Sequence, residues 1–438
     1  MITRRGYWAI AAALAGLVIA MLTLEVVLLF LAVVVFAFLG ANLIVFHVQT
    51  ADLTSGSLTA RRSATFSRVP RSVDSVTSVT VRYAGRHGFW AEFVDVAPDA
   101  FEMRAGRRRL VTWWDPGTEK TLAYAFRSRV RGALVVGPTV VTAYDPLGIA
   151  RRSARLPTSR PVTVLPSAVP IRPGPIGRAL VTPAPGRMVV RRRGFGTEFR
   201  SLRPYQSTDD IRHVAWKRST LEQIYVREFE QESRQDYLLI IDLSEEMRSG
   251  QWGEAAIDRS VDAATVVVHA IARQGEDRVG LLTYVNGVFQ YLPPGRGPRQ
   301  YKRLTDNLAL MAVRPGRFDL GDALGQATRR LTQHSHVFSF SPLRGPTQGL
   351  AASLARFRSR GHRLYQFVPE IEGFYPTPTD PVGAEVFDWA ADGERRRREA
   401  VIAVLQRQGI PVFPFDRGGA AEKVMSAYYR IRAWENAR

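Results

Sequence analysis

The apolar stretch near the start of the chain constrains its fold more than any other feature. It runs from Trp8 to Phe46. Its polar interruptions are Thr23, Glu25 and Asn42. A single helix of this length would extend about 58 Å, roughly twice the thickness of a bilayer's hydrocarbon core. We therefore expect two membrane spans, at about residues 8–24 and 26–46, joined by a turn that keeps the Glu25 charge at an interface.

Charges at the two ends of this segment predict its orientation. Basic residues precede the first span and follow the second: Arg4, Arg5, Arg61 and Arg62. We expect residues 1–48 to form a hairpin that anchors the protein in the cell membrane. By the positive-inside rule we expect both ends of this hairpin, and the soluble domains, to face the cytoplasm. The alternative for the first span is a cleaved signal peptide, but no A-x-A-like site separates the two spans.

Residues 49–170 have the pattern of a small antiparallel β-sandwich. Short stretches rich in β-branched and aromatic residues alternate with turn residues such as Gly85, Gly106 and Gly117. Asp145-Pro146 and Gly148 indicate a turn at a strand end. Three tryptophans of this region, Trp90, Trp113 and Trp114, are expected in the core or close to the membrane rather than on a ligand platform. A linker rich in proline and glycine follows, at 167–190.

The C-terminal part, residues 236–438, predicts a doubly wound α/β domain. The apolar run Leu238–Ile241 ends in Asp242-Leu243-Ser244, as expected of a buried strand that delivers polar residues to its carboxyl end. Strand and helix patterns then alternate, which favours a parallel sheet covered on both faces. Asn286-Gly287 predicts a hairpin and hence one antiparallel edge strand. Glu394 and Arg395–Arg398 are expected to begin a helix as a solvated face.

The segment between these parts, within residues 171–235, is dense in charge of both signs and carries Tyr205 and Trp216. Composition alone favours a solvated surface. The carboxylate pair Asp209-Asp210 has Arg203, Arg212 and Lys217 nearby, which favours ion pairing or helix capping over acid–base chemistry.

This segment resembles the signature of domain-of-unknown-function family 58, prokaryotic membrane-anchored proteins with a von Willebrand factor A-like domain. The matching residues are Gly194, Gly196, Glu198, Phe199, Leu202, Arg203, Tyr205, Asp209, Asp210, Arg212, Trp216, Lys217, Arg227, Glu228, Phe229 and Glu230. Ser207-Thr208 stands where the family has glycine, and Ala215 where it has aspartate. The resemblance extends to the turn at Asp145 and to the C-terminal part. It implies a partnership with MoxR-type AAA+ ATPases in the assembly or activation of other complexes.

Such domains often hold Mg²⁺ through an Asp-x-Ser-x-Ser motif, a later threonine and a later aspartate. Here Asp242 and Ser244 match, and Glu246 replaces the second hydroxyl. Phe318 stands at the threonine position and Ser341-Pro342 at the usual Ser-Asp. Two readings stay open: an altered Mg²⁺ site at Asp242, Ser244 and Glu246, or side chains that satisfy backbone groups at a strand end.

Composition narrows the classes of function. The chain has 438 residues, no cysteine and a formal net charge of +20, which excludes thiol chemistry and favours an anionic membrane surface or nucleic acid as a neighbour. No recognition helix or zinc-finger spacing supports nucleic acid. No nucleophile elbow, Walker motif or HExxH appears. We therefore expect a non-enzymatic protein without a nucleic-acid partner.

The sequence thus predicts a membrane-anchored cytoplasmic adaptor that binds its partner through the charged signature and the carboxyl edge of the sheet. The expected interface residues are Glu198, Arg203, Asp209, Asp210, Arg212, Trp216, Lys217, Arg227 and Glu228. Two alternatives remain, a metal-dependent ligand-binding module and a structural component of the envelope.

Overall fold

The computed structural model describes residues 2–437 apart from 55, 64–66, 72, 168–191, 195–197, 207–208, 221–222, 232–234, 276, 345–347 and 377. The chain divides into two compact units, Met1–Leu165 and Pro166–Arg438. From residue 168 on, the expected linker lies outside the described residues, as do Gly196 and Ser207-Thr208 of the signature.

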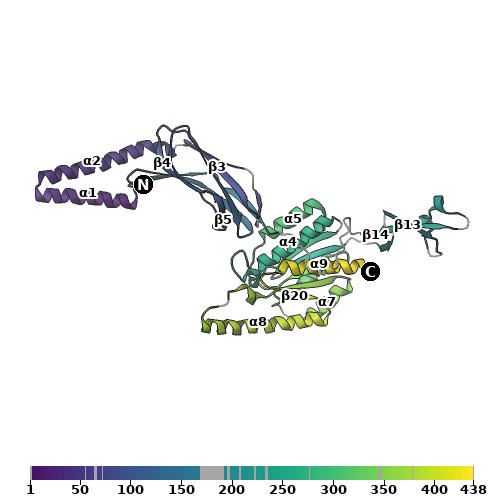
Figure 1. Cartoon of the computed structure of the whole chain (residues 1–438). Helices are drawn as coiled ribbons and strands as arrows, with labels where there is room; N and C mark the ends of the chain where they lie inside the picture. Colours follow the sequence, from purple (N-terminus) through teal and green to yellow (C-terminus); the bar gives the residue numbers. More distant parts are fainter. Residues whose placement is uncertain are drawn as a thin grey trace. The chain divides into compact units, whose positions relative to one another are not determined.

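Two antiparallel helices, α1 (Arg4–Thr23) and α2 (Val26–Gln49), open the first unit (Figure 1). Both are long and apolar enough to cross a membrane. Leu24 makes the turn between them in the left-handed region, with φ 56°, which Gly and Asn more commonly occupy. The last turn of α2 carries Phe46 into the core of the β-sandwich that follows.

The β-sandwich of this unit consists of two four-stranded antiparallel sheets and a smaller third sheet. The first sheet has the order β1 (Leu58–Arg62), β3 (Ser75–Tyr83), β7 (Glu119–Ser128) and β5 (Phe101–Gly106). The second has the order β10 (Arg151–Leu156), β9 (Thr139–Tyr144), β4 (Phe89–Asp95) and β6 (Arg109–Trp114). The third joins β2 (Arg68–Pro70), β11 (Arg160–Leu165) and β8 (Gly132–Val136). Alternate residues of the first two sheets, such as Val81 and Phe93, meet in one core.

A buried ion pair lies within this sandwich. The Arg62 guanidinium donates to both oxygens of Asp95, at 2.8 and 2.5 Å, and both side chains are almost fully buried. The Tyr124 hydroxyl at 2.7 Å and the Thr139 hydroxyl at 3.1 Å also donate to Asp95. Every oxygen of the carboxylate therefore has hydrogen-bond partners, as a buried charge requires.

The second unit begins with a small antiparallel sheet that holds the charged signature. Its order is β12 (Arg192–Gly194), β14 (Tyr225–Gln231) and β13 (Glu198–Pro204). Two short 3-10 turns, η2 (Ile211–His213) and η3 (Trp216–Arg218), lie in the connection from β13 to β14. The bridge between Val214 and Val226 ties this connection to β14.

A six-stranded sheet forms the rest of this unit. Its order is β17 (Val288–Gly295), β16 (Arg278–Val285), β15 (Asp236–Asp242), β18 (Ser335–Phe340), β19 (Arg363–Pro369) and β20 (Val412–Phe415). All neighbours run parallel except β17, the antiparallel edge strand that Asn286-Gly287 predicts. Both turn residues have positive φ, at 49° and 75°, as a type I′ hairpin requires.

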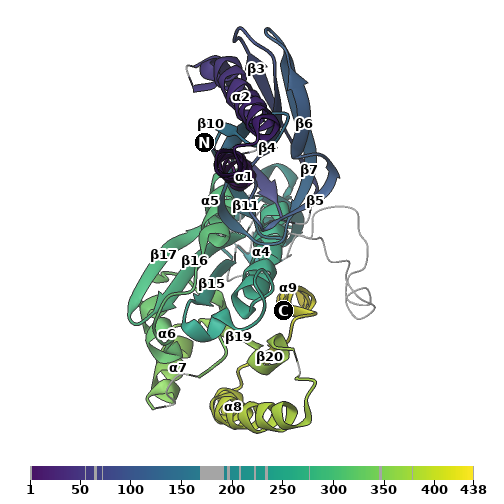
Figure 2. The same cartoon turned by 90° about the vertical axis from the view of Figure 1, so that its left-hand side faces the viewer.

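Helices cover both faces of this sheet (Figure 2). The side chains of Leu239 and Ile241 point to one face and join the core made with α4 (Ala256–Gln274), α5 (Gly297–Leu310) and α9 (Ala420–Ala437). Leu238 and Ile240 point to the other, where the core is made with α6 (Leu320–Arg330), α7 (Leu350–Ser359) and α8 (Pro381–Arg407). This doubly wound, von Willebrand factor A-like arrangement, with the helical hairpin and the sandwich, confirms the expected fold class.

One local prediction was wrong. The helix expected from Glu394 begins at Pro381, because Asp380 caps it by accepting from the Gly383 N–H at 2.6 Å. Its basic run is not simply a solvated face, since Arg398 is buried and forms two hydrogen bonds with Glu372, at 2.8 and 2.6 Å. Sequence pattern alone does not show Glu372, which comes from a separate turn, η5 (Ile371–Phe374).

Candidate functional site

The first part of the site is the connection from β13 to β14. Arg203, at the end of β13, forms a two-pronged ion pair with Asp209, with distances of 2.7 and 2.5 Å. Asp209 also accepts from the Gln206 N–H at 2.8 Å. The Arg203 hydrogen bond, followed by that from Gln206, holds the pKa of Asp209 below its usual value. These two signature residues therefore shape the loop.

Asp210 has a different task in the same loop. Its carboxylate accepts from the Arg212 N–H at 2.9 Å and so caps η2. The expectation that Asp209-Asp210 serves ion pairing and capping is confirmed. Ala215, where the family has aspartate, is buried and donates its N–H to the Tyr225 carbonyl at 2.8 Å.

The loop built in this way presents an exposed cluster, which we call the signature cluster. Its members, from η2 and η3, are Ile211, Arg212, Trp216 and Lys217. The exposed fractions of Ile211 and Trp216 are 63% and 66%. Trp216 and Arg212 belong to the residue types, tryptophan and arginine, that contribute most binding energy at protein interfaces.

Three other expected interface residues lie on the strands. Arg227 is exposed on β14, opposite Leu202 of β13. Glu198 lies in β13 opposite Glu230, and Glu228 lies in β14 opposite Ser201. The structure therefore brings the nine expected residues into one small sheet and its connection.

The second part of the site lies at the carboxyl end of β15, where Asp242 is buried. The carboxylate accepts from the Ser244 N–H at 2.7 Å and from the Ser341 hydroxyl at 3.0 Å. Burial raises the pKa of Asp242 to about 7; the hydrogen bonds from Ser244 and Ser341 oppose this rise, and the nearby Glu246 adds to it. The side chain thus changes charge near neutral pH.

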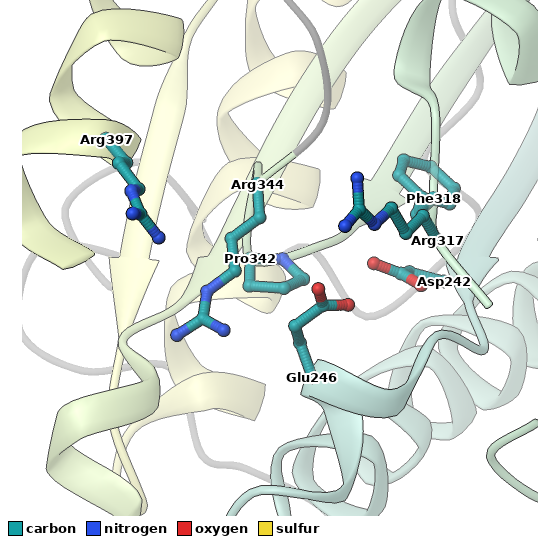
Figure 3. Close-up of a pocket in the computed structure, with 7 residues that line it drawn as sticks. All are labelled: Asp242, Glu246, Arg317, Phe318, Pro342, Arg344 and Arg397. Carbon is teal, nitrogen blue, oxygen red and sulfur yellow. The ribbon is translucent and has the colours of Figure 1, made fainter. Parts of the chain in front are cut away.

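A cavity of about 320 Å³ opens beside Asp242. Figure 3 shows its lining: Asp242, Glu246, Arg317, Phe318, Pro342, Arg344 and Arg397. The Asp242 and Glu246 carboxylates lie near each other, and the Arg344 and Arg397 side chains lie on the far side of Pro342 (Figure 3). Arg344 and Arg397 also face Glu394, at 2.9 and 3.4 Å. The cavity therefore combines two carboxylates with three guanidinium groups.

These residues do not reproduce an Mg²⁺ site of the kind that the fold often holds. Phe318 is buried against Tyr284 where a threonine would be needed. Asp319 accepts from the Asp322 N–H at 3.1 Å and so caps α6. Among the described residues, no group of three His, Cys, Asp or Glu side chains could hold a metal ion. The Ser244 hydroxyl is buried without a partner of good hydrogen-bond geometry, although it is close enough to Asp242 to lower the pKa of that carboxyl.

The family of this segment can be stated now that its frame is described. Residues 201–365 match the model of the family described as "Protein of unknown function DUF58". The match begins within β13 and ends within β19, so the expected resemblance is confirmed over this part of the chain. No curated protein matches the chain.

Solved structures similar to this chain include bacterial proteins. The conserved hypothetical protein BatB from Bacteroides thetaiotaomicron is 13% identical, with a TM-score of 0.33, over 46% of this chain and 99% of its own. An aerotolerance-related membrane protein from Bacteroides fragilis is 14% identical, with a TM-score of 0.32, over 45% and 99%. The SpRpn10 VWA domain is 14% identical, with a TM-score of 0.31, over 44% and 95%. No statement about function follows from similarities at this level.

Sequence reasoning missed the arginines of the cavity beside Asp242. Arg317 follows β17 and α5, Arg344 follows β18, and Arg397 lies in α8. The sequence carries a signal only for Arg344, which comes shortly after β18, because a doubly wound sheet binds its ligands beyond the carboxyl ends of its strands.

Proposed function

We propose that this DUF58 protein is a membrane-anchored, non-enzymatic adaptor that binds a MoxR-type AAA+ ATPase from the cytoplasmic side and helps to assemble or activate other complexes. In general terms, the von Willebrand factor A-like domain serves as an interaction or adhesion module. The observation that carries the proposal is the signature cluster, whose exposed Trp216 and Ile211 stand beside Arg212 and Lys217. Such a surface supports docking of another protein better than it supports chemistry.

The arrangement of charges distinguishes the residues that hold the loop in shape, which we call the frame, from the exposed residues that are available to contact a partner. Arg203, Asp209 and Asp210 form hydrogen bonds inside the loop, at 2.5 to 2.9 Å. The contact surface then consists of the side chains that the frame leaves exposed, and the cavity beside Asp242 adds a second point of attachment. Substitutions at the frame would disturb the loop itself, so the contact residues give the clearer test.

The test is capture of the ATPase by the full chain in detergent, with and without ATP and Mg²⁺. We expect an AAA+ ATPase to bind the wild type, and the Trp216→Ala, Lys217→Glu double variant to bind at least about tenfold more weakly. Trp389→Ala is the matched control, because Trp389 is also exposed, at 76%, but lies in α8. Equal capture by the double variant, or no captured ATPase at all, would reject the proposal. The latter outcome would favour a structural component of the envelope.

The proposed cytoplasmic orientation has its own test, because the chain contains no cysteine. Val76 of β3 is an exposed position for a single cysteine, with an exposed fraction of 65%. A membrane-impermeant maleimide should leave Val76→Cys unlabelled in intact cells and label it after lysis. Labelling in intact cells would place the sandwich outside.

A metal-dependent ligand-binding module is the second candidate. The buried Ser244 hydroxyl beside Asp242 favours it, since a cation would supply the missing partner. The replaced threonine and aspartate positions and the arginines of the cavity count against it.

A further inference from the structure

The base of the helical hairpin is fixed to one end of the sandwich by the turn after Tyr144. At the start of α1, the Thr3 N–H donates to the Ile149 carbonyl at 2.7 Å and the Thr3 hydroxyl to the Gly148 carbonyl at 2.6 Å. The Asn42 side chain of α2 donates to Asp145 at 2.7 Å. Both helices are thus attached to the same strand end, between β9 and β10.

The hairpin is too short to carry this end of the sandwich far from a bilayer. From Val26 to Asn42, α2 rises about 24 Å at 1.5 Å per residue, whereas a hydrocarbon core is about 30 Å thick. Exposed apolar side chains continue beyond this point on α2, at Ile44, Val45 and Val48. If the hairpin spans the membrane, as the proposed function requires, the strand end at Tyr144 lies at the level of the lipid headgroups.

An aromatic row crosses the outer face of the second sheet at this same end. In the strand register, Arg151 of β10 lies beside Tyr144 of β9. Tyr144 lies one position beyond the Ala91–Ala143 pair and is therefore beside Trp90 of β4. Trp90 in turn lies beside Trp113 of β6. Trp90 and Trp113 meet edge to face, with ring centroids 5.9 Å apart, and have exposed fractions of 50% and 38%. Val111, in the next row, is 59% exposed. Their inward neighbours fill the core, so this row faces solvent.

Basic side chains flank the row. Arg151 is exposed at the start of β10. Arg86 is exposed in the β3–β4 turn, where its N–H donates to Asp52 just after α2, at 3.1 Å. Tryptophan and tyrosine prefer the membrane interface because one end of each ring system is apolar and the other polar. Arginines beside them suit anionic headgroups.

We propose that this end of the sandwich is a lipid-binding surface, in which Trp90, Trp113 and Tyr144 insert among the headgroups and Arg86 and Arg151 contact anionic lipid. The partner is the anionic surface of the bilayer that the hairpin crosses. The sandwich is then held in one orientation on the membrane. This proposal depends on membrane insertion of the hairpin, which is part of the proposed function, but not on the ATPase.

The test uses spin labels on single cysteines in the full chain, in nanodiscs of phosphatidylcholine and phosphatidylglycerol. Val111→Cys reports on the row. Val76→Cys is the matched control, because it is also an exposed valine of the sandwich but lies seven residues along β3 from Tyr83, about 23 Å away. Val34→Cys, in the middle of α2, reports on insertion.

We expect the ratio of oxygen to nickel-complex accessibility at residue 111 to be at least about threefold that at residue 76. Trp90→Ala with Trp113→Ala should lower the ratio at residue 111 to the value at 76. Equal ratios at 111 and 76, with a lipid-exposed label at residue 34, would overturn this proposal and leave the membrane anchor standing. A water-exposed label at 34 would overturn both.

Discussion

Asp95 in the first unit and Asp242 in the second are both buried, and the two carboxylates have opposite surroundings. Asp95 of the sandwich is enclosed with Arg62, Tyr124 and Thr139, so that a guanidinium balances its charge. Asp242 of the α/β sheet receives only neutral donors, from Ser244 and Ser341, and burial raises its pKa to about 7. In the first arrangement each charge compensates the other, so loss of either partner leaves a buried charge unpaired. The second leaves a group whose charge responds to what enters the cavity beside it, which is the behaviour expected of a functional site.

Removal of the guanidinium partner of Asp95 should have the largest effect. Arg62→Met leaves a buried charge uncompensated, so we expect the free energy of unfolding of the sandwich to fall by about 3–5 kcal/mol. Arg82→Met is the control, because Arg82 and Glu119 form an exposed pair at 3.9 Å, worth about 0–1 kcal/mol. Denaturant unfolding measures both. The addition of Asp95→Asn to Arg62→Met should recover part of the loss; equal stability of Arg62→Met and wild type would contradict the structural role.

The charge of Asp242 should appear as a pH dependence. Its pKa is higher in the folded than in the unfolded state, so the free energy of unfolding falls as pH rises from about 4 to about 7. Asp242→Asn removes this loss. Above pH 7 the variant should be more stable than wild type by roughly 2–4 kcal/mol, and the difference should vanish at pH 4.

Denaturant unfolding of the α/β unit at both pH values measures this difference. If the free energy of unfolding changed with pH equally in the wild type and in Asp242→Asn, burial would not be raising the pKa of the Asp242 carboxyl. Asp95→Asn, by contrast, leaves the buried Arg62 guanidinium without its carboxylate partner and should lower the free energy of unfolding. This contrast separates the two aspartates.

The arginines of the cavity should affect binding rather than folding. Arg317 is exposed at the carboxyl edge, so Arg317→Glu should weaken capture of the ATPase by about tenfold while the melting temperature stays near that of wild type. Arg329→Glu makes the same charge change at the exposed far end of α6. If both variants lose binding equally, the effect is one of net charge and not of the cavity.

Magnesium should have the smallest effect. Saturating Mg²⁺ should shift the melting temperature of the wild type by less than about 1 °C, because a ligand that does not bind the folded state cannot stabilise it. Phe318→Thr with Pro342→Asp restores two oxygen donors, and this variant should gain a response to Mg²⁺. A clear shift in the wild type that Asp242→Asn abolishes would instead establish the metal-dependent module.

Much of the fold was predictable because it depends on local pattern. Hydropathy predicts α1 and α2, Asn286-Gly287 predicts the edge hairpin, and Asp210 beside Arg212 was expected to cap or pair. The start of α8 was missed although the sequence carries signals for it: Asp380-Pro381 is a typical helix start, and Val382, Val386 and Trp389 have the spacing of one helix face. These apolar side chains are exposed, so packing against the sheet does not reveal this part of the helix. The separation of frame residues from contact residues in the signature also required the structure.

The sequence by itself determined the apolar helical hairpin, the position of Asp242 at a buried strand end and the charged signature, because each depends on residues that are neighbours along the chain. Only the tertiary structure decided how charges that are distant along the chain are balanced. Arg62 reaches Asp95 across 33 positions, and Arg317, Arg344 and Arg397 meet at one cavity from separate loops and helices. Burial raises the pKa of Asp242, and burial arises only when helices and sheets pack together. Ion pairs between two sheets also require that packing. A local sequence pattern therefore predicts neither.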